Sequence, residues 1–170
     1  MKKLYPTNLS ESKKSRWLRR VFNIWPCIWS TGSSVTFIAG NWQELHVELS
    51  LNWRTRNRVG TVFGGSIYSS IDPYYMLLLM EILGKNFIVW DKAASVKFVR
   101  PITHKAKCRF LIPDHTIDEI KKIVAEKGEH TFDFPLQFED EQENVYAVFT
   151  KSVYVASKEF YKEKLAQRKQ

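Results

Sequence analysis

A long apolar segment, residues 64–83, constrains the fold more than any other part of this sequence. It opens with two adjacent glycines and is followed by Gly84, a residue type that commonly ends helices. A helix this apolar is unsuited to a wet surface, so we expect a sheet to curl around it. Its longest uninterrupted run, residues 74–83, contains Glu81 and is too short to span a membrane. The segment therefore predicts a long central helix in a soluble protein.

The segments around this helix alternate between apolar and polar residues with the period of a β-strand. In residues 105–112, for example, Ala106, Cys108, Phe110 and Ile112 fall on one face. We expect six strands and a short helix, at residues 35–39, 45–51, 87–99, 105–112, 131–138 and 145–155 for the strands and 116–126 for the helix. This order predicts an α+β fold with a curled antiparallel sheet. Such a sheet has exposed edges, which favours edge-to-edge pairing of two subunits.

Composition and charge indicate one globular domain without a nucleic-acid-binding face. The chain has 170 residues, of which 44% are hydrophobic and 26% charged, so a packed core is expected. The formal net charge of +8 resides at the ends, because residues 1–20 carry +6 and residues 158–170 carry +3. Nucleic-acid binding needs its positive charge clustered on the fold. We expect a single domain over residues 1–157 and a basic tail over residues 158–170.

Cysteine and histidine usage gives no sign of a metal site. The two cysteines, Cys27 and Cys108, are far apart in the sequence, which excludes a closely spaced zinc-binding pair and a disulfide framework. The four histidines have no metal-ligand spacing. We therefore expect no metal and a reducing, cytoplasmic setting.

An amphipathic helix is predicted at about residues 11–29. Apolar residues, among them Trp17, Trp25 and Trp29, recur at helical spacing opposite several lysines and arginines. A basic, Trp-rich helix suits a membrane-surface anchor. Pro26 and the continuation into the domain favour instead a helix that packs on its own core.

The glycine pair at the start of the central helix is a candidate binding point. The first amides of a helix have no intrahelical partner, and Gly64-Gly65 lets another group approach them closely. Such a helix end attracts a phosphate, or the oxygen of a carbonyl that becomes an oxyanion. A glycine pair is also compatible with a simple turn.

Asp72 is the second candidate in this segment. On a continuous helix it shares a stripe with Gly65, Ser69 and Met76. An acid on an apolar helix is costly to bury unless it is paired, hydrated or used in chemistry. The sequence Asp72-Pro73 is also typical of a helix start, with the aspartate as cap of a second helical segment.

These residues resemble the hot-dog-fold thioesterases, in particular the acyl-CoA thioesterases of the phenylacetate-degradation type. The elements with matching spacing are Asn57, Gly60, Thr61, Gly64, Gly65 and Asp72. A second group of hot-dog proteins, usually described as thioesterases, is similar over nearly the whole chain. Its shared elements are Trp25-Pro26, Asn57, Gly60-Thr61, Phe63-Gly64-Gly65-Ser66, Asp72-Pro73, Val89-Trp90-Asp91-Lys92 and Phe98-Val99-Arg100-Pro101.

The resemblance implies a hot-dog fold and hydrolysis of an acyl thioester such as acyl-CoA, in a site between two subunits. The Gly65 amide would hold the thioester carbonyl, and Asp72 would activate the attacking water or attack directly. Asn57 would position the thioester or the water. Coenzyme A enters only as part of the substrate, and the subunits are expected to form a homodimer or a dimer of dimers.

Further substrate contacts are expected near this motif and from basic residues that could meet the phosphates of coenzyme A. The expected substrate-binding residues are Gly64, Thr61, Phe63, Ser69, Arg58 and Arg100. Other basic side chains in the same position to meet phosphates are Arg54, Arg56, Lys92 and Lys97. Basic side chains on a surface are also commonly just solvated.

One departure from the family pattern keeps a second function open. Many relatives have histidine where this chain has Phe63, so one hydrogen-bonding group near the oxyanion is missing. The alternative is a non-catalytic protein that binds acyl thioesters or lipids. A third class, a nucleic-acid or membrane-surface binder, rests on the basic ends and the Trp-rich first helix.

Overall fold

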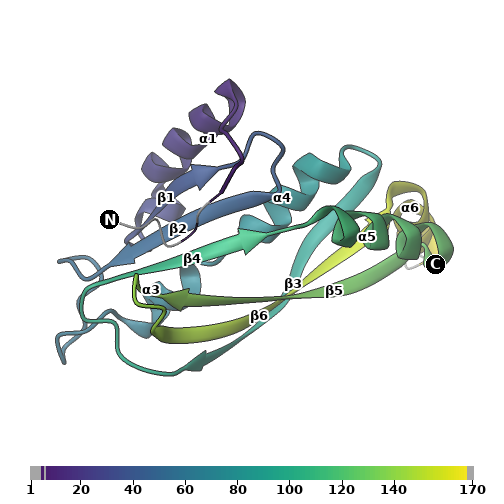
Figure 1. Ribbon diagram of the computed structural model, residues 1–170. Helices are drawn as coiled ribbons and strands as arrows, with labels where there is room; N and C mark the ends of the chain where they lie inside the picture. The colour runs from purple at the N-terminus through teal and green to yellow at the C-terminus, as the bar shows by residue number, and fades with distance from the viewer. Residues whose placement is uncertain (1–4, 6, 168–170) are drawn as a thin grey trace.

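A six-stranded antiparallel sheet, curled but not closed, forms the framework of the protein (Figure 1). The structure is a computed structural model that describes residue 5 and residues 7–167. Along the sheet the strands follow the order β1-β2-β4-β5-β6-β3. In chain order the elements are α1 (Lys13–Ile24), α2 (Pro26–Trp29), β1 (Ser33–Ile38), β2 (Glu44–Ser50), α3 (Gly64–Ser69), α4 (Tyr74–Leu83), β3 (Phe87–Phe98), β4 (Lys105–Leu111), α5 (Asp114–Lys127), β5 (Glu129–Glu139), β6 (Val145–Ser157) and α6 (Lys158–Gln167).

The predicted α+β arrangement is confirmed, and α4 supplies the centre of its core. Tyr74, Leu78 and Leu79 of α4 are fully buried. They meet large side chains from the concave face of the sheet, and the rings of Tyr74 and Phe110 are 5.2 Å apart in an edge-to-face arrangement. Alternating strand positions therefore face the helix, which explains the period of two in the sequence.

The central apolar segment consists of two helices, because a turn at residues 70–73 separates α3 from α4. Pro73 occupies the N-cap position of α4 and follows a cis peptide bond. A second helical segment after Asp72 is thus present as predicted. Asp72 does not cap it, because its carboxylate accepts a hydrogen bond from Lys151 on β6 instead. The break turns an acid out of the helix and toward the sheet.

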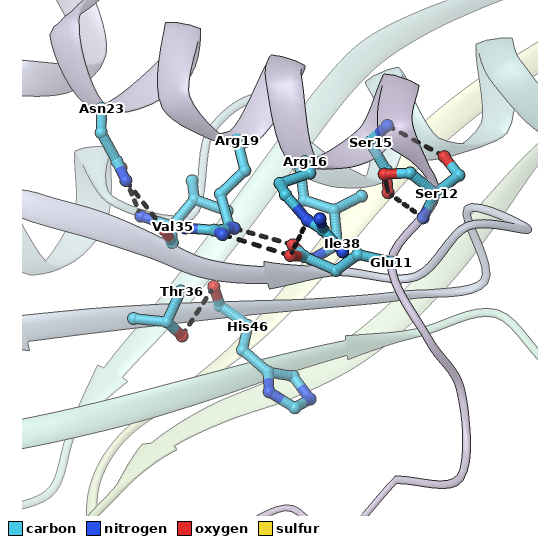
Figure 2. A network of polar contacts seen from close by, with 10 residues as sticks. All are labelled: Glu11, Ser12, Ser15, Arg16, Arg19, Asn23, Val35, Thr36, Ile38 and His46. Atoms are coloured by element: carbon cyan, nitrogen blue, oxygen red, sulfur yellow. Dashed lines mark hydrogen bonds and ion pairs between the residues drawn. The ribbon is translucent and has the colours of Figure 1, made fainter.

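Helix α1 closes one edge of the sheet. Figure 2 shows Asn23 beside β1, where its side chain accepts from the Val35 amide (2.7 Å) and donates to the Val35 carbonyl (2.9 Å). The Ile38 amide donates to Glu11 (3.3 Å), whose carboxylate is held in turn by Arg19. These side chains take the hydrogen-bonding positions that a further strand would use.

The packing predicted for the N-terminal helix is only partly confirmed. Phe22 and Ile28 are buried, as expected for a helix on its own core. The expectation that the apolar side chains of this helix face the core is wrong for Trp17, Ile24 and Trp29, which are exposed. Two helices, α1 and α2, replace the single one, because Pro26 starts the short α2.

The opposite edge of the sheet is β3, whose pairing partner is β6. Trp90 on this strand is 55% exposed, and Phe98 and the adjoining Val99 are exposed as well. A long edge strand with exposed apolar side chains is a template for pairing with another strand.

The two ends of the chain are described in part. Residues 158–167 of the predicted basic tail form α6, which contacts β6 and β3. Residues 1–4 and 6 of the predicted domain and residues 168–170 of the tail lie outside the described part. Within that part no helix has the length and apolar character needed to cross a membrane.

The contacts of Asn23 lead to a stability prediction. The Asn23→Ala variant should lower the free energy of unfolding by about 1–3 kcal/mol, because the amide and carbonyl of Val35 lose their partners. Urea titration measures this change. Arg20→Ala, on the exposed side of the same helix, should stay within about 0.5 kcal/mol of wild type. Equal effects in the two variants would contradict the role of Asn23.

Candidate active site

A cavity of about 450 Å³ lies where the turn at residues 70–73 meets α2, β3 and β6. Its lining combines a cluster of charged side chains with polar and apolar ones. The residues that line it are Cys27, Ile28, Thr31, Tyr68, Ser69, Asp72, Pro73, Asp91, Lys92, Ala93, Ala94 and Lys151.

Lys151 links the charged groups of this cavity. Its ammonium group lies 2.6 Å from Asp72 and 3.1 Å from Asp91. Only 6% of its side chain is exposed, whereas 56% of the Asp72 side chain and 21% of the Asp91 side chain are exposed. A buried lysine requires such partners, because an unpaired charge in the core is strongly destabilising. Asp72 is therefore the carboxylate that a molecule in the cavity meets first.

Strand alternation brings Asp91 to this cluster. Asp91 follows the buried Val89 by two residues and pairs with Val153, which faces the core. A β-bulge comes directly after it, because the register between β3 and β6 shifts between Asp91 and Ala93, and bulges are frequent beside functional sites. One oxygen of Asp91, Oδ1, is buried without a hydrogen-bonding partner among the described residues. A buried carboxyl oxygen without a donor favours the uncharged acid.

The ionisation of Asp72 is governed by Lys151. Burial by itself raises the pKa of Asp72, but the hydrogen bond and positive charge of Lys151, with a hydrogen bond from Asp91, outweigh it and lower the pKa. Burial likewise opposes the charge of Lys151, yet its two carboxylate partners raise the pKa of the ammonium group. Asp72 and Lys151 are thus both ionised at neutral pH.

The pKa of Asp91 is shifted in the opposite direction to that of Asp72. Burial, together with a hydrogen bond to Asp72 in the protonated state, raises the pKa of Asp91 to about 6 despite the nearby Lys151. Two neighbouring carboxyl groups with pKa values pushed in opposite directions are typical of an acid–base pair. The cluster can therefore hold one carboxylate ionised and move a proton on and off the other.

A metal ion is not needed to hold these carboxylates together, since the lysine ammonium group supplies the positive charge. The described residues contain no group of three or more His, Cys, Asp or Glu side chains arranged for a metal.

Two of the residues predicted from sequence, Ser69 and Asp72, line the cavity. Asn57 does not join them, because its side chain closes its own turn. Its Oδ1 accepts from the Val59 and Thr61 amides, each at 3.0 Å, and its Nδ2 donates to the Thr61 hydroxyl at 2.9 Å. Asn57 and the predicted contact residue Thr61 thus form one rigid turn before α3.

The glycine pair begins α3, as predicted, and two aromatic rings cover it. A Cβ on Gly65 would collide with the ring of Phe63, and one on Gly64 would come within 3.3 Å of Phe98. Phe63 itself is exposed on its outer side. A side chain at Gly65 would therefore exclude the Phe63 ring from its position, and one at Gly64 would crowd Phe98.

The predicted phosphate-binding arginines do not line the cavity. Arg100, beyond the end of β3, donates to Asn144 (3.2 Å), and Arg58 is exposed in the turn of Asn57. Lys92, which sequence analysis placed in the same group, does line the cavity and donates to Thr131 (3.2 Å).

Sequence reasoning missed Lys151 and the role of Asp91. The signal for Lys151 is its position in β6, since it falls in the alternating row of Ala147, Phe149 and Val153, all of which face the core. A charged residue in such a row needs a partner of opposite charge. The corresponding signal for Asp91 is its alternation with the buried Val89.

Comparison with known proteins agrees with this architecture. The model of a family described as a domain of unknown function, DUF4442, matches residues 14–155. No match was found among curated proteins.

Several solved structures share the fold. Protein PA5026 from Pseudomonas aeruginosa, described as a probable thioesterase, has 14% identity and a TM-score of 0.73 and covers 88% of this chain and 99% of its own. Thioesterase HI1161 from Haemophilus influenzae has 11% identity and a TM-score of 0.61, covering 89% and 96%. The E. coli PaaI protein from the phenylacetic acid degradation operon has 12% identity and a TM-score of 0.57, covering 82% and 92%. The hot-dog fold expected from the sequence is thereby confirmed.

The central position of Lys151 leads to a prediction about stability and pH. In Lys151→Met the two carboxyl groups lose their cation, so their pKa values should rise. A carboxyl group whose pKa is raised in the folded state loses folding free energy as it ionises with increasing pH. The variant should therefore lose about 3–5 kcal/mol near neutral pH, and less in mild acid. Urea unfolding at the two pH values measures the difference.

Lys92→Met is the matched control, because Lys92 lines the same cavity but is exposed. It should show a small loss that does not depend on pH. A pH-independent loss in Lys151→Met would contradict the coupling between Lys151 and the two carboxyl groups.

Proposed function

The chain belongs to the DUF4442 family, and we propose that it hydrolyses an acyl thioester, with acyl-CoA as the substrate. The observation that carries the proposal is the contact of Lys151 with Asp72 and Asp91 in the lining of a cavity. A hot-dog fold whose structural neighbours include named thioesterases supports it.

The two carboxyl groups suit the proton transfers of this reaction. Asp72 takes a proton from water while the water oxygen attacks the thioester carbonyl, whose electron pair moves onto its oxygen. The proton then passes to Asp91, because the raised pKa of Asp91 makes it the stronger base of the pair. When the C–S bond breaks, Asp91 returns the proton to the leaving thiolate. The products are a carboxylic acid and a thiol, so atoms and charge balance.

Lys151 acts as a positioning residue in this scheme. Its ammonium group fixes the orientation of Asp72 and keeps it ionised before the substrate arrives. Held geometry of this kind lowers the entropic part of the barrier.

The oxyanion is best stabilised by a second subunit. Gly65 is in the first turn of α3, whereas Asp72 follows the other end of that helix, and only Asp72 lines the cavity. One thioester carbonyl is too small to contact both groups of the same chain. We therefore assign the Gly65 amide, with the turn of Asn57, to the site that contains Asp72 of a partner copy.

The two edges of the sheet support such a homodimer. Side chains of α1 occupy the hydrogen-bonding groups of β1, whereas β3 is the last strand and carries exposed Trp90 and Phe98. Pairing of β3 with its copy would bury these rings and would bring two cavities to one interface. Both cysteines are free thiols, which supports a reducing compartment such as the cytoplasm.

A non-catalytic acyl-thioester or lipid-binding protein is the second candidate. Phe63 favours it, because its ring packs against Gly65 and offers no hydrogen bond at a position where many members of the resembled family have a histidine. In that case acyl-CoA would bind in the cavity and remain intact.

Thiol release from acyl-CoA esters of increasing chain length distinguishes the two functions. Wild type should turn over, and Asp72→Asn should lose at least about a hundredfold in kcat, because the proton acceptor is gone. The kcat/KM of wild type should rise with pH through about 6, as Asp91 becomes ionised. Asp91→Asn should lack this rise, and Asn57→Ala should be impaired.

Far-UV circular dichroism and urea unfolding control for the fold of each variant. Turnover that is unchanged in Asp72→Asn would reject the assignment of this residue. Bound but intact acyl-CoA on folded wild-type protein would support the binding function instead.

The proposed dimer is tested by a charge at the open edge. Trp90→Lys should shift the protein to monomer in sedimentation velocity, because two lysines would meet at the paired strands. Leu165→Lys, on α6 and also exposed, is the matched control and should leave the assembly unchanged. A dimer that persists in Trp90→Lys would place the interface elsewhere.

A further inference from the structure

The outward face of α1 is both aromatic and basic. Ser15 and Phe22 are the buried residues of this helix and lie within about 20° of each other around its axis. Trp17 and Ile24 lie within about 20° of the direction diametrically opposite, with Arg20 beside them. Ile24 is 76% exposed. The helix therefore packs through one stripe and presents a second apolar stripe to its surroundings.

This outward stripe continues through α2 to the turn after β2. Trp25, between α1 and α2, and Trp29 of α2 are exposed. Arg54 donates to the Trp29 carbonyl (2.7 Å), and its guanidinium group stacks 4.4 Å from the centre of the Trp29 ring. The neighbouring Trp53 is 83% exposed, with its ring centre 6.0 Å from the same group. We refer to these residues as the aromatic–basic face: Lys13, Trp17, Arg20, Ile24, Trp25, Trp29, Trp53 and Arg54.

The charge of this face is of one sign. The sequence contains no Asp or Glu from residue 12 to residue 43, nor from residue 49 to residue 71. Glu11, at the start of the helix, is turned inward and is bound by Arg19 at 2.7 Å. The face thus combines several cations with four exposed tryptophans.

We propose that the aromatic–basic face docks onto a bilayer surface rich in anionic lipids. Indole rings settle at the level of lipid headgroups, where their apolar part and their N–H group are both accommodated, and lysine and arginine pair with anionic headgroups. Ile24 inserts among the acyl chains.

Two other occupants fit this face less well. A two-fold contact with a second copy would bring two positive faces together. A nucleic acid would satisfy the cations but would leave Ile24 in water. The bilayer is the occupant that uses both the charges and the apolar side chains.

Docking in this orientation has a consequence for the cavity. Cys27 and Ile28, which line it, lie between Trp25 and Trp29 on α2. The wall of the cavity would therefore be at the lipid surface, which suits acyl chains that partition into membranes. This consequence rests on the proposed thioesterase function, whereas the docking itself does not.

Co-sedimentation of the full chain with vesicles tests the docking. Phosphatidylcholine vesicles that contain phosphatidylserine should bind the protein, and pure phosphatidylcholine vesicles should bind it much less. The Lys13→Glu/Arg20→Glu variant should lose at least about tenfold in partitioning. Lys121→Glu/Lys122→Glu, with exposed lysines on α5, changes the net charge equally and should stay within about twofold of wild type.

The aromatic part is tested by Trp17→Ala/Trp53→Ala, which should reduce binding by about tenfold while brominated lipids quench the fluorescence of wild type. Asp72→Asn should bind vesicles like wild type, so a failure of hydrolysis is distinguishable from a failure of docking. Equal losses in the two charge-reversal variants would overturn the proposal, since only overall charge would then matter. It would also be overturned by tighter binding to single-stranded RNA, or by loss of self-association in Trp17→Ala/Trp53→Ala.

Discussion

A single buried ammonium group, that of Lys151, ties together the parts of the fold that form the cavity. Its charge in a core strand is tolerable only beside carboxylates, because an unpaired buried charge costs several kcal/mol. Two neighbouring elements supply them. Asp91 faces inward on β3 in alternation with Val89, and the break between α3 and α4 leaves Asp72 outside both helices. Lys151 of β6 contacts both carboxylates and so joins the strand to the turn.

The sheet is asymmetric in a way that limits how it can grow. At β1 the side chains of Asn23 and Glu11 take the place of a neighbouring strand, and α1 lies across them. At β3 the strand edge and its aromatic side chains are open. A subunit with one open edge can pair with one copy of itself and then has no edge left, so closed dimers are favoured over extended assemblies.

The sequence predicts the framework well because the framework depends on local periodicity. Alternation places all six strands, and the glycines at both ends of the apolar segment delimit the central helices. Asp72 is recognisable because an acid stands out among apolar neighbours. Lys151 was missed since it lies far along the chain from Asp72, and its significance depends on which strand face packs against the turn. The outward direction of Trp17 and Ile24 was missed for a related reason, because an amphipathic pattern with two apolar stripes does not reveal which stripe meets the core.

The aromatic rings around α3 bear on the loss of a histidine near the oxyanion. In one subunit, Phe63 and Phe98 flank the glycine pair and are exposed on their outer sides. Pairing at β3 would cover them and would remove water from the Gly65 amide. A hydrogen bond from an amide to a developing negative charge is stronger where water is excluded, because the local dielectric constant is lower. If the proposed dimer forms, Phe63 would thus replace a hydrogen-bonding group by a drier environment in the proposed hydrolysis. The open edge of the sheet therefore bears on the chemistry of the site, because pairing at that edge would determine how much water reaches it.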